Sequence, residues 1–218
     1  MPHVVLLGDS IFDNRVYVAP EPDVMRQLRS RLGSDWKATL LAVDGHVTAD
    51  VRERQLPQLP DDASHLVLSV GGNDALGRAA VLGQAASTVG DAVAMLDRAR
   101  ERFRDDYRLL LDALVATDLQ VAVCTVYDAN YPGSEGRVVE AALSLFNDII
   151  TREAFRRALP LIDLRLICDR PEDYANPIEP SAAGGDKIAA ATAAMLDGPP
   201  ATRSTIWTHG RAGDERRR

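Results

Sequence analysis

The sequence predicts an α/β protein, a three-layer αβα sandwich built on a five-stranded parallel sheet. Short apolar runs of strand length recur along the chain, and the segments between them carry apolar residues at helical spacing. Strands that alternate with helices favour a parallel sheet covered on both faces and joined by right-handed crossovers. The chain has 218 residues, 46% hydrophobic and 26% charged, which is enough for one globular domain with a large core.

The expected strands are short, apolar and rich in β-branched residues. Val4–Leu7 contains no polar position, which is typical of a strand that is buried on both faces. Each run ends at glycine, proline or polar residues, which are the usual bounds of a strand. The five runs cover residues 4–7, 38–43, 65–70, 119–126 and 161–164.

The expected helices lie between these strands. Over residues 23–33 the apolar positions have helical spacing, with Asp23 as the N-cap and Gly33 as the C-terminal stop. Residues 75–90 are rich in small residues and predict a loop with a broken helix. Further helices are expected over residues 49–56, 91–117, 138–159 and 182–196, and polar loops over residues 127–136 and 168–181.

The composition changes after residue 198. Pro199 and Pro200 end the last helix, and the final residues are rich in arginine. We therefore expect a folded domain over residues 1–198 and a mobile tail over residues 199–218. Trp207 and His209 are the two tail residues that we expect to be able to dock on the domain.

Charge and hydropathy exclude several kinds of partner. The net charge of −7 argues against a general nucleic-acid-binding protein, which needs a basic surface. No apolar run is long enough to span a membrane, and Pro2 and His3 lead directly into the first strand without a signal peptide. We expect a cytoplasmic protein, and the sequence carries no signal for its oligomeric state.

The two cysteines do not indicate a metal site or a disulfide framework. Cys124 lies within an apolar strand-like run, which predicts a buried and unreactive thiol. Neither Cys124 nor Cys168 has the spacing of a metal ligand. The sequence therefore predicts no metal and no cofactor.

Three polar motifs follow strands, at the edge where parallel sheets form their sites. Gly8-Asp9-Ser10 follows the first strand and places a serine in a turn, which suits an exposed nucleophile. Gly45 follows the second strand, and Gly71-Gly72-Asn73-Asp74 follows the third. Asp9 and Asp74 are acidic neighbours of this edge, and we expect them to cap turns.

In this order and at these strand ends, the motifs resemble those of the SGNH (GDSL) hydrolase family, over residues 3–197. The resemblance implies a flavodoxin-like strand order, 2-1-3-4-5, and a serine esterase that acts on a small-molecule ester without a cofactor. It also implies that Ser10 is the nucleophile. The oxyanion hole would comprise the Ser10 N–H, the Gly45 N–H and the Asn73 side-chain amide.

The chain departs from the family pattern at the last motif, which is usually Asp-x-x-His. Here Asn176 stands at the Asp position and Glu179 at the His position. The usual base and its orienting carboxylate are therefore both replaced.

Three interpretations of this departure stay open. In the first, Glu179 is the general base of a Ser10–Glu179 dyad, its pKa raised by burial, with Asn176 orienting the carboxylate through a hydrogen bond. In the second, His46 serves as the base. In the third, the site has lost hydrolysis and the protein only binds a ligand. The first makes the chain an acyl-ester hydrolase, and the same site could pass the acyl group to an alcohol if water were excluded.

Overall fold

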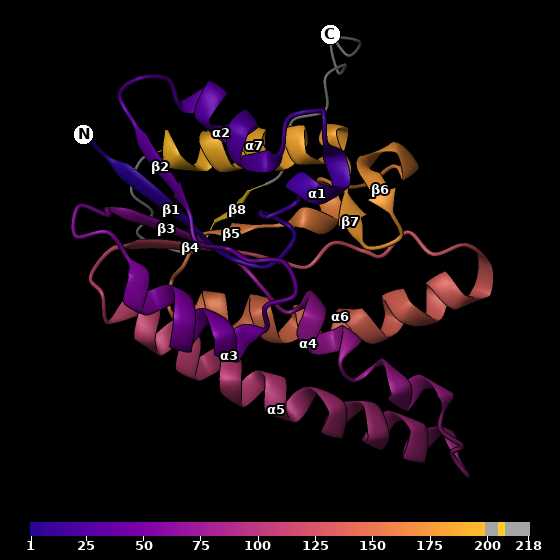
Figure 1. Ribbon diagram of the computed structural model, residues 1–218. Coiled ribbons are helices and arrows are strands. Elements are labelled where there is room, and N and C mark those ends of the chain that lie inside the picture. Colours follow the sequence, from indigo (N-terminus) through magenta and orange to yellow (C-terminus); the bar gives the residue numbers. More distant parts are fainter. Residues whose placement is uncertain (199–204, 208–218) are drawn as a thin grey trace, which may run out of the picture.

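The computed structural model describes residues 1–198 and 205–207. Its central sheet has six parallel strands in the order β2-β1-β3-β4-β5-β8 (Figure 1). The first five positions confirm the predicted order 2-1-3-4-5. The strands are β1 (His3–Gly8), β2 (Lys37–Leu40), β3 (His65–Ser69), β4 (Gln120–Cys124), β5 (Leu161–Ile162) and β8 (Ile206–Trp207).

The sixth strand comes from the segment predicted to be a tail. In β8, Ile206 pairs with Leu161 and Trp207 pairs with Ile162 of β5. Trp207 therefore docks at the edge of the sheet, and the expected five strands become six. The other tail predictions, including those for His209 and the C-terminal arginines, concern residues outside the described part of the chain.

Helices cover both faces of the sheet. In Figure 1, α2 and α7 lie on one face, and α3, α5 and α6 lie on the other. The α-helices are α1 (Arg15–Val18), α2 (Val24–Leu32), α3 (Thr48–Asp50), α4 (Gly72–Leu76), α5 (Val89–Val115), α6 (Gly133–Arg156) and α7 (Ala182–Leu196). The short π- and 3₁₀-helices are η1 (Val51–Gln55), η2 (Leu56–Gln58), η3 (Ala79–Gly83), η4 (Leu164–Leu166) and η5 (Pro171–Asp173).

The alternation of side chains along each strand divides the core into two clusters. In β1, Val5 and Leu7 belong to the cluster that includes α5 and α6, whereas Val4 and Leu6 belong to the cluster that includes α2 and α7. All four residues are fully buried. This is why the first run has no polar position: each face of the strand is covered by a helical layer.

Most predicted bounds hold to within a few residues. Asp23 caps α2 through a bond from the Arg26 N–H, and α7 has the predicted bounds. The strand predicted over residues 38–43 ends at Leu40. The predicted loop over 168–181 contains η5 and a hairpin of two antiparallel strands, β6 (Tyr174–Asn176) and β7 (Glu179–Pro180). Within the described ranges, no helix is both long and apolar enough to cross a membrane.

Candidate active site

A glycine turn after β1 fixes the position of Ser10. Gly8 has φ +134°, and a Cβ there would lie 1.8 Å from the Ser69 carbonyl oxygen, so only glycine fits. The Gln55 side chain accepts from the Gly8 N–H (2.8 Å) and donates to the Gly8 carbonyl (2.7 Å). The Asp9 N–H donates to the Ser69 carbonyl at 3.2 Å. The chain therefore turns sharply at the carboxyl end of the sheet and holds Ser10 in place.

The β6–β7 hairpin fixes the position of Glu179. Oδ1 of Asn176 accepts hydrogen bonds from the backbone N–H groups of Ile178 and Glu179, both at 3.0 Å. The Tyr127 hydroxyl donates to the Ile178 carbonyl at 2.6 Å. Asn176 thus holds the backbone of Glu179, whereas the sequence suggested a bond to its carboxylate. The amide supports the loop, and the carboxylate stays available to other partners.

Ser10 and Glu179, 169 positions apart in the chain, meet at this edge. The Ser10 hydroxyl donates to Oε1 of Glu179 at 3.1 Å. The two residues are 7% and 5% exposed, and Oε2 of Glu179 has no partner among the described residues. Burial raises the pKa of Glu179 to about 7, opposed by the Ser10 hydrogen bond and assisted by the charge of Asp44. A carboxylate with this pKa can gain and lose a proton near neutral pH.

Two further acids lie beside this pair. Asp9 accepts a hydrogen bond from the Ile11 N–H within its own turn, as expected. Asp74 does not cap its own turn: it lies within α4 and accepts from the N–H and hydroxyl of Thr48, at the start of α3. Burial raises the pKa of Asp9 to about 8, despite the bond from Ile11 and with help from the charge of Glu179. Burial also raises the pKa of Asp74. The pKa of Asp9 therefore lies far above that of an exposed aspartate, close to the neutral range.

Asn73 lies in the first turn of α4, and Gly45 lies in the loop between β2 and α3. Nδ2 of Asn73 donates one hydrogen to the backbone carbonyl of His46 at 3.0 Å, which fixes the amide and leaves its second hydrogen free to donate. Gly45 has φ +81°, and a Cβ at this position would meet nothing within 4 Å. Gly45 is exposed at this edge, and it is not among the residues that line the cavity beside Ser10.

The histidines have other partners. Nδ1 of His46 lies 3.0 Å from Nε2 of Gln55, and since an amide nitrogen only donates, this His46 nitrogen accepts. The His46 ring is therefore bound to the residue that holds Gly8, whereas Ser10 donates to Glu179. His3 and His65 begin β1 and β3, at the opposite edge of the sheet, as predicted.

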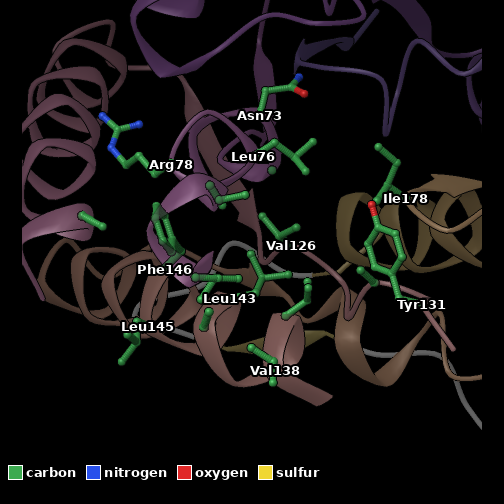
Figure 2. A pocket seen from close by; sticks show the side chains of 18 of the residues that line it. Asn73, Leu76, Arg78, Val126, Tyr131, Val138, Leu143, Leu145, Phe146 and Ile178 are labelled. Atoms are coloured by element: carbon green, nitrogen blue, oxygen red, sulfur yellow. The ribbon is translucent and has the colours of Figure 1, made fainter. Parts of the chain in front are cut away.

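A cavity of about 590 Å³ opens beside the pair, and its lining includes Ser10, Asn73 and Glu179. Figure 2 shows the apolar side chains of Leu76, Val126, Val138, Leu143 and Phe146 around it. Sequence reasoning did not single out these apolar wall residues. Their spacing identifies helices, but it does not reveal a gap between them. Within the described residues, no group of three His, Cys, Asp or Glu could hold a metal ion.

The family model for GDSL-like lipases and acylhydrolases matches residues 6–187. The chain belongs to this family. Members of the GDSL-like lipase/acylhydrolase family are hydrolases, and the match confirms the resemblance predicted from the strand-end motifs. Ser10, Asn73 and Glu179 all fall within the matched range. A search of curated proteins found no match.

Solved structures agree with this fold. The extracellular lipase from Streptomyces rimosus is similar, with a TM-score of 0.65 at 18% identity over 86% of this chain and 96% of that chain. The acetyl xylan esterase AlAXEase gives a TM-score of 0.67 at 18% identity, over 89% and 99% of the two chains. Phospholipase A1 from Streptomyces albidoflavus NA297 gives 0.61 at 19% identity, over 84% and 94%. At these identities the likeness establishes the fold.

Proposed function

We propose that this GDSL-family protein is a serine acyl-ester hydrolase in which Ser10 is the nucleophile and Glu179 the general base. The observation that carries the proposal is the 3.1 Å hydrogen bond from the Ser10 hydroxyl to the buried Glu179 carboxylate. A nucleophile and a base within hydrogen-bond reach are the geometric requirement for covalent catalysis. The substrate is a small-molecule ester, and the reaction needs no cofactor. A cytoplasmic location remains a prediction from the sequence.

In the acylation step, Oγ of Ser10 forms a bond to the ester carbonyl carbon while its proton passes to Oε1 of Glu179. The carbonyl oxygen becomes an oxyanion. When this intermediate collapses, the ester C–O bond breaks and the leaving alkoxide takes the proton from Glu179. In deacylation, water attacks the acyl-serine, gives its proton to Glu179, and the released Oγ of Ser10 takes that proton back.

The oxyanion needs hydrogen-bond donors, and three candidate donors lie at the carboxyl edge of the sheet, where Ser10 lies. The Asn73 amide has a hydrogen free beyond the one given to His46, and the Gly45 backbone is open to solvent. Together with the Ser10 N–H, these groups form the proposed oxyanion hole. The bond from Asn73 to the residue after Gly45 ties the start of α4 to the Gly45 loop, which supports a preorganised arrangement.

The electrostatics support Glu179 over His46 as the base. A general base works best when its pKa lies near the working pH, and the pKa of Glu179 is raised to about 7. Pro177 and Pro180 flank the hairpin turn and restrict its backbone. Nδ1 of His46 accepts from Gln55, whereas the Ser10 hydroxyl donates to Glu179.

Two measurements test the proposal. Ser10 should be labelled by a fluorophosphonate, as intact mass would show, and the protein should hydrolyse p-nitrophenyl acetate. Ser10→Ala and Glu179→Gln should abolish turnover, whereas His46→Ala should retain it. Loss in His46→Ala but not in Glu179→Gln would assign the base to His46. A parent that resists the probe and turns over no ester would identify a ligand-binding protein that has lost hydrolysis.

A further inference from the structure

The cavity beside Ser10 continues along the surface as a groove. A second cavity of about 540 Å³ adjoins it, and Leu82, Leu96 and Leu145 line both. The groove thus runs from the nucleophile, past α4 and η3, and out between the N-terminal halves of α5 and α6. In Figure 1 the first half of α5 and the η3 segment extend beyond the end of the sheet. This extension forms the outer part of the groove.

The walls of the groove are apolar and partly exposed. Leu76 is 43% exposed, Val93 59% and Val138 52%. Leu76 lines the inner cavity beside Ser10, Val93 lines the outer cavity, and Val138 lines both. Figure 2 shows that Val126, Leu143 and Phe146, all carbon side chains, lie between Arg78 on one side and Tyr131 on the other. Contiguous exposed apolar surface that leads to a site marks a binding groove for an apolar group.

The position of Glu179 determines which part of an ester enters the groove. The leaving oxygen must lie beside Glu179, because this carboxyl returns the proton to it. The outer cavity is lined by η3, α5 and α6 and, among the described residues, by none from the β6–β7 hairpin that carries Glu179. The groove therefore leads away from the leaving group. The carbonyl carbon carries two substituents, the leaving alcohol and the acyl chain. Because the alcohol lies beside Glu179, the acyl chain is the one that extends into the groove.

We propose that the groove binds a linear, medium-to-long acyl chain, which makes the preferred substrate a fatty acyl ester with a small alcohol. This inference rests on the proposed function, because the direction of the chain follows from the role of Glu179. The charged and polar residues Asp97, Arg100 and Arg137 line the outer cavity, where the end of a long chain would reach solvent. The walls nearer Ser10 offer mainly apolar contact.

The first experiment compares p-nitrophenyl esters from acetate to decanoate. Each buried methylene contributes up to about fourfold, so kcat/KM should rise at least about tenfold across the series. Ala142→Trp, at a position that lines both cavities, should lower the decanoate-to-acetate ratio at least about tenfold. Ala194→Trp is the matched control: it is exposed on α7, on the other face of the sheet, and should keep the parent ratio. A flat series, or a ratio unchanged in Ala142→Trp, would overturn the proposal.

The second experiment tests the direction of the chain. Ethyl decanoate and decyl acetate carry the same ten-carbon chain on opposite sides of the ester. A pH-stat assay should show faster hydrolysis of ethyl decanoate. Preference for decyl acetate would place the alcohol in the groove and contradict the proposal.

A binding measurement separates the groove from catalysis. The Ser10→Ala variant should bind the uncharged ketone 2-decanone at least about tenfold more tightly than 2-butanone by calorimetry, and adding Ala142→Trp should remove the difference. Tighter binding of 2-decanone together with no ester hydrolysis by the parent would refute the proposed function and support the acyl-binding role of the groove. Ester hydrolysis without tighter binding of 2-decanone would refute the acyl-binding role of the groove and support the proposed function.

Discussion

Glu153 and Glu179 are both buried glutamates, 3% and 5% exposed, but they lie in opposite electrostatic settings. Glu153, on α6, receives hydrogen bonds from Arg108, Arg156 and Arg157 at 2.7–2.8 Å. Burial alone would raise the pKa of Glu153, but the bonds from Arg157 and Arg108 outweigh it and leave the pKa below its ordinary value. This carboxylate stays ionised and ties α5 to α6.

Glu179 has no such compensation. Its carboxylate accepts from the neutral Ser10 hydroxyl, and no arginine or lysine of the described chain bonds to it. Burial raises its pKa to about 7. A buried acid with cationic partners stabilises the fold, whereas one without them is ready to exchange a proton. The difference is consistent with a structural role for Glu153 and supports the proposed role of Glu179 as the base.

The largest expected effect is on the rate, in Glu179→Gln. The amide keeps the shape but cannot accept the serine proton, so kcat should fall by about 10²–10⁴. The free energy of unfolding should not fall, since the change removes a buried charge that no cation compensates. Ester hydrolysis and urea denaturation measure the two quantities. A rate within about threefold of the parent would contradict the role of Glu179.

Glu153→Gln should show the opposite pattern. Arg157 is only 17% exposed at its side chain, and losing the Glu153 carboxylate removes one of its two acidic partners and leaves it Asp112. We expect the free energy of unfolding to fall by about 1–3 kcal/mol and kcat/KM to stay unchanged. Because the pKa of Glu153 is lowered, its stabilisation is present above the ordinary value of 4.5 and is lost as pH falls through the folded value. The difference between parent and variant should therefore shrink in acid, as urea titrations at several pH values would show.

Asp9→Asn extends the comparison to a second buried acid without a cation. The pKa of Asp9 is raised from 3.8 to about 8, so the folded state binds a proton that the unfolded state has released between these values. The contribution of Asp9 to stability is therefore greatest below pH 3.8 and declines as pH rises toward 8. Asparagine carries no charge, so at pH 8 the free energy of unfolding of the variant should exceed that of the parent by more than about 1 kcal/mol. Urea denaturation at pH 8 measures this difference. Equal stability of the two proteins at pH 8 would contradict the raised pKa of Asp9.

The smallest expected effect is a shift in the pH profile of Asp44→Asn. The proposed mechanism requires ionised Glu179, so the parent rate should fall as pH drops through about 7. The negative charge of Asp44 helps to raise this pKa, and its removal should move the acid limb to lower pH. Asp35→Asn, at another exposed position, is the control and should leave the limb in place. A shift to higher pH in Asp44→Asn would be inconsistent with the charge effect.

The parts of the site that follow strands could be predicted from the sequence. Gly8, Ser10 and Asn73 lie directly after apolar runs, and parallel strands bring such positions to one edge. The Ser10–Glu179 contact was also foreseen, because the frame around Glu179 resembles the family's last motif. The structure brings these residues together as expected, while their roles stay proposals.

Other features depend on tertiary structure and had no local signal. Ile206–Trp207 is too short to identify as a strand, and only its pairing with β5 defines it. The acyl groove arises because the first halves of α5 and α6 run past the end of the sheet. The role of Asn176 was misassigned because the sequence shows that an amide is near Glu179 but not which atoms it meets.

The two tryptophans of the chain lie at opposite edges of the sheet. Trp36 directly precedes β2 and packs against the His65 ring at 4.9 Å between centroids, whereas Trp207 lies in β8. Each edge thus carries its own natural fluorophore. In single-tryptophan variants, Trp36→Phe and Trp207→Phe, the emission reports on one edge at a time. Coincident unfolding curves would indicate one cooperative unit, and earlier loss of the Trp207 signal would show that the two-residue strand opens first.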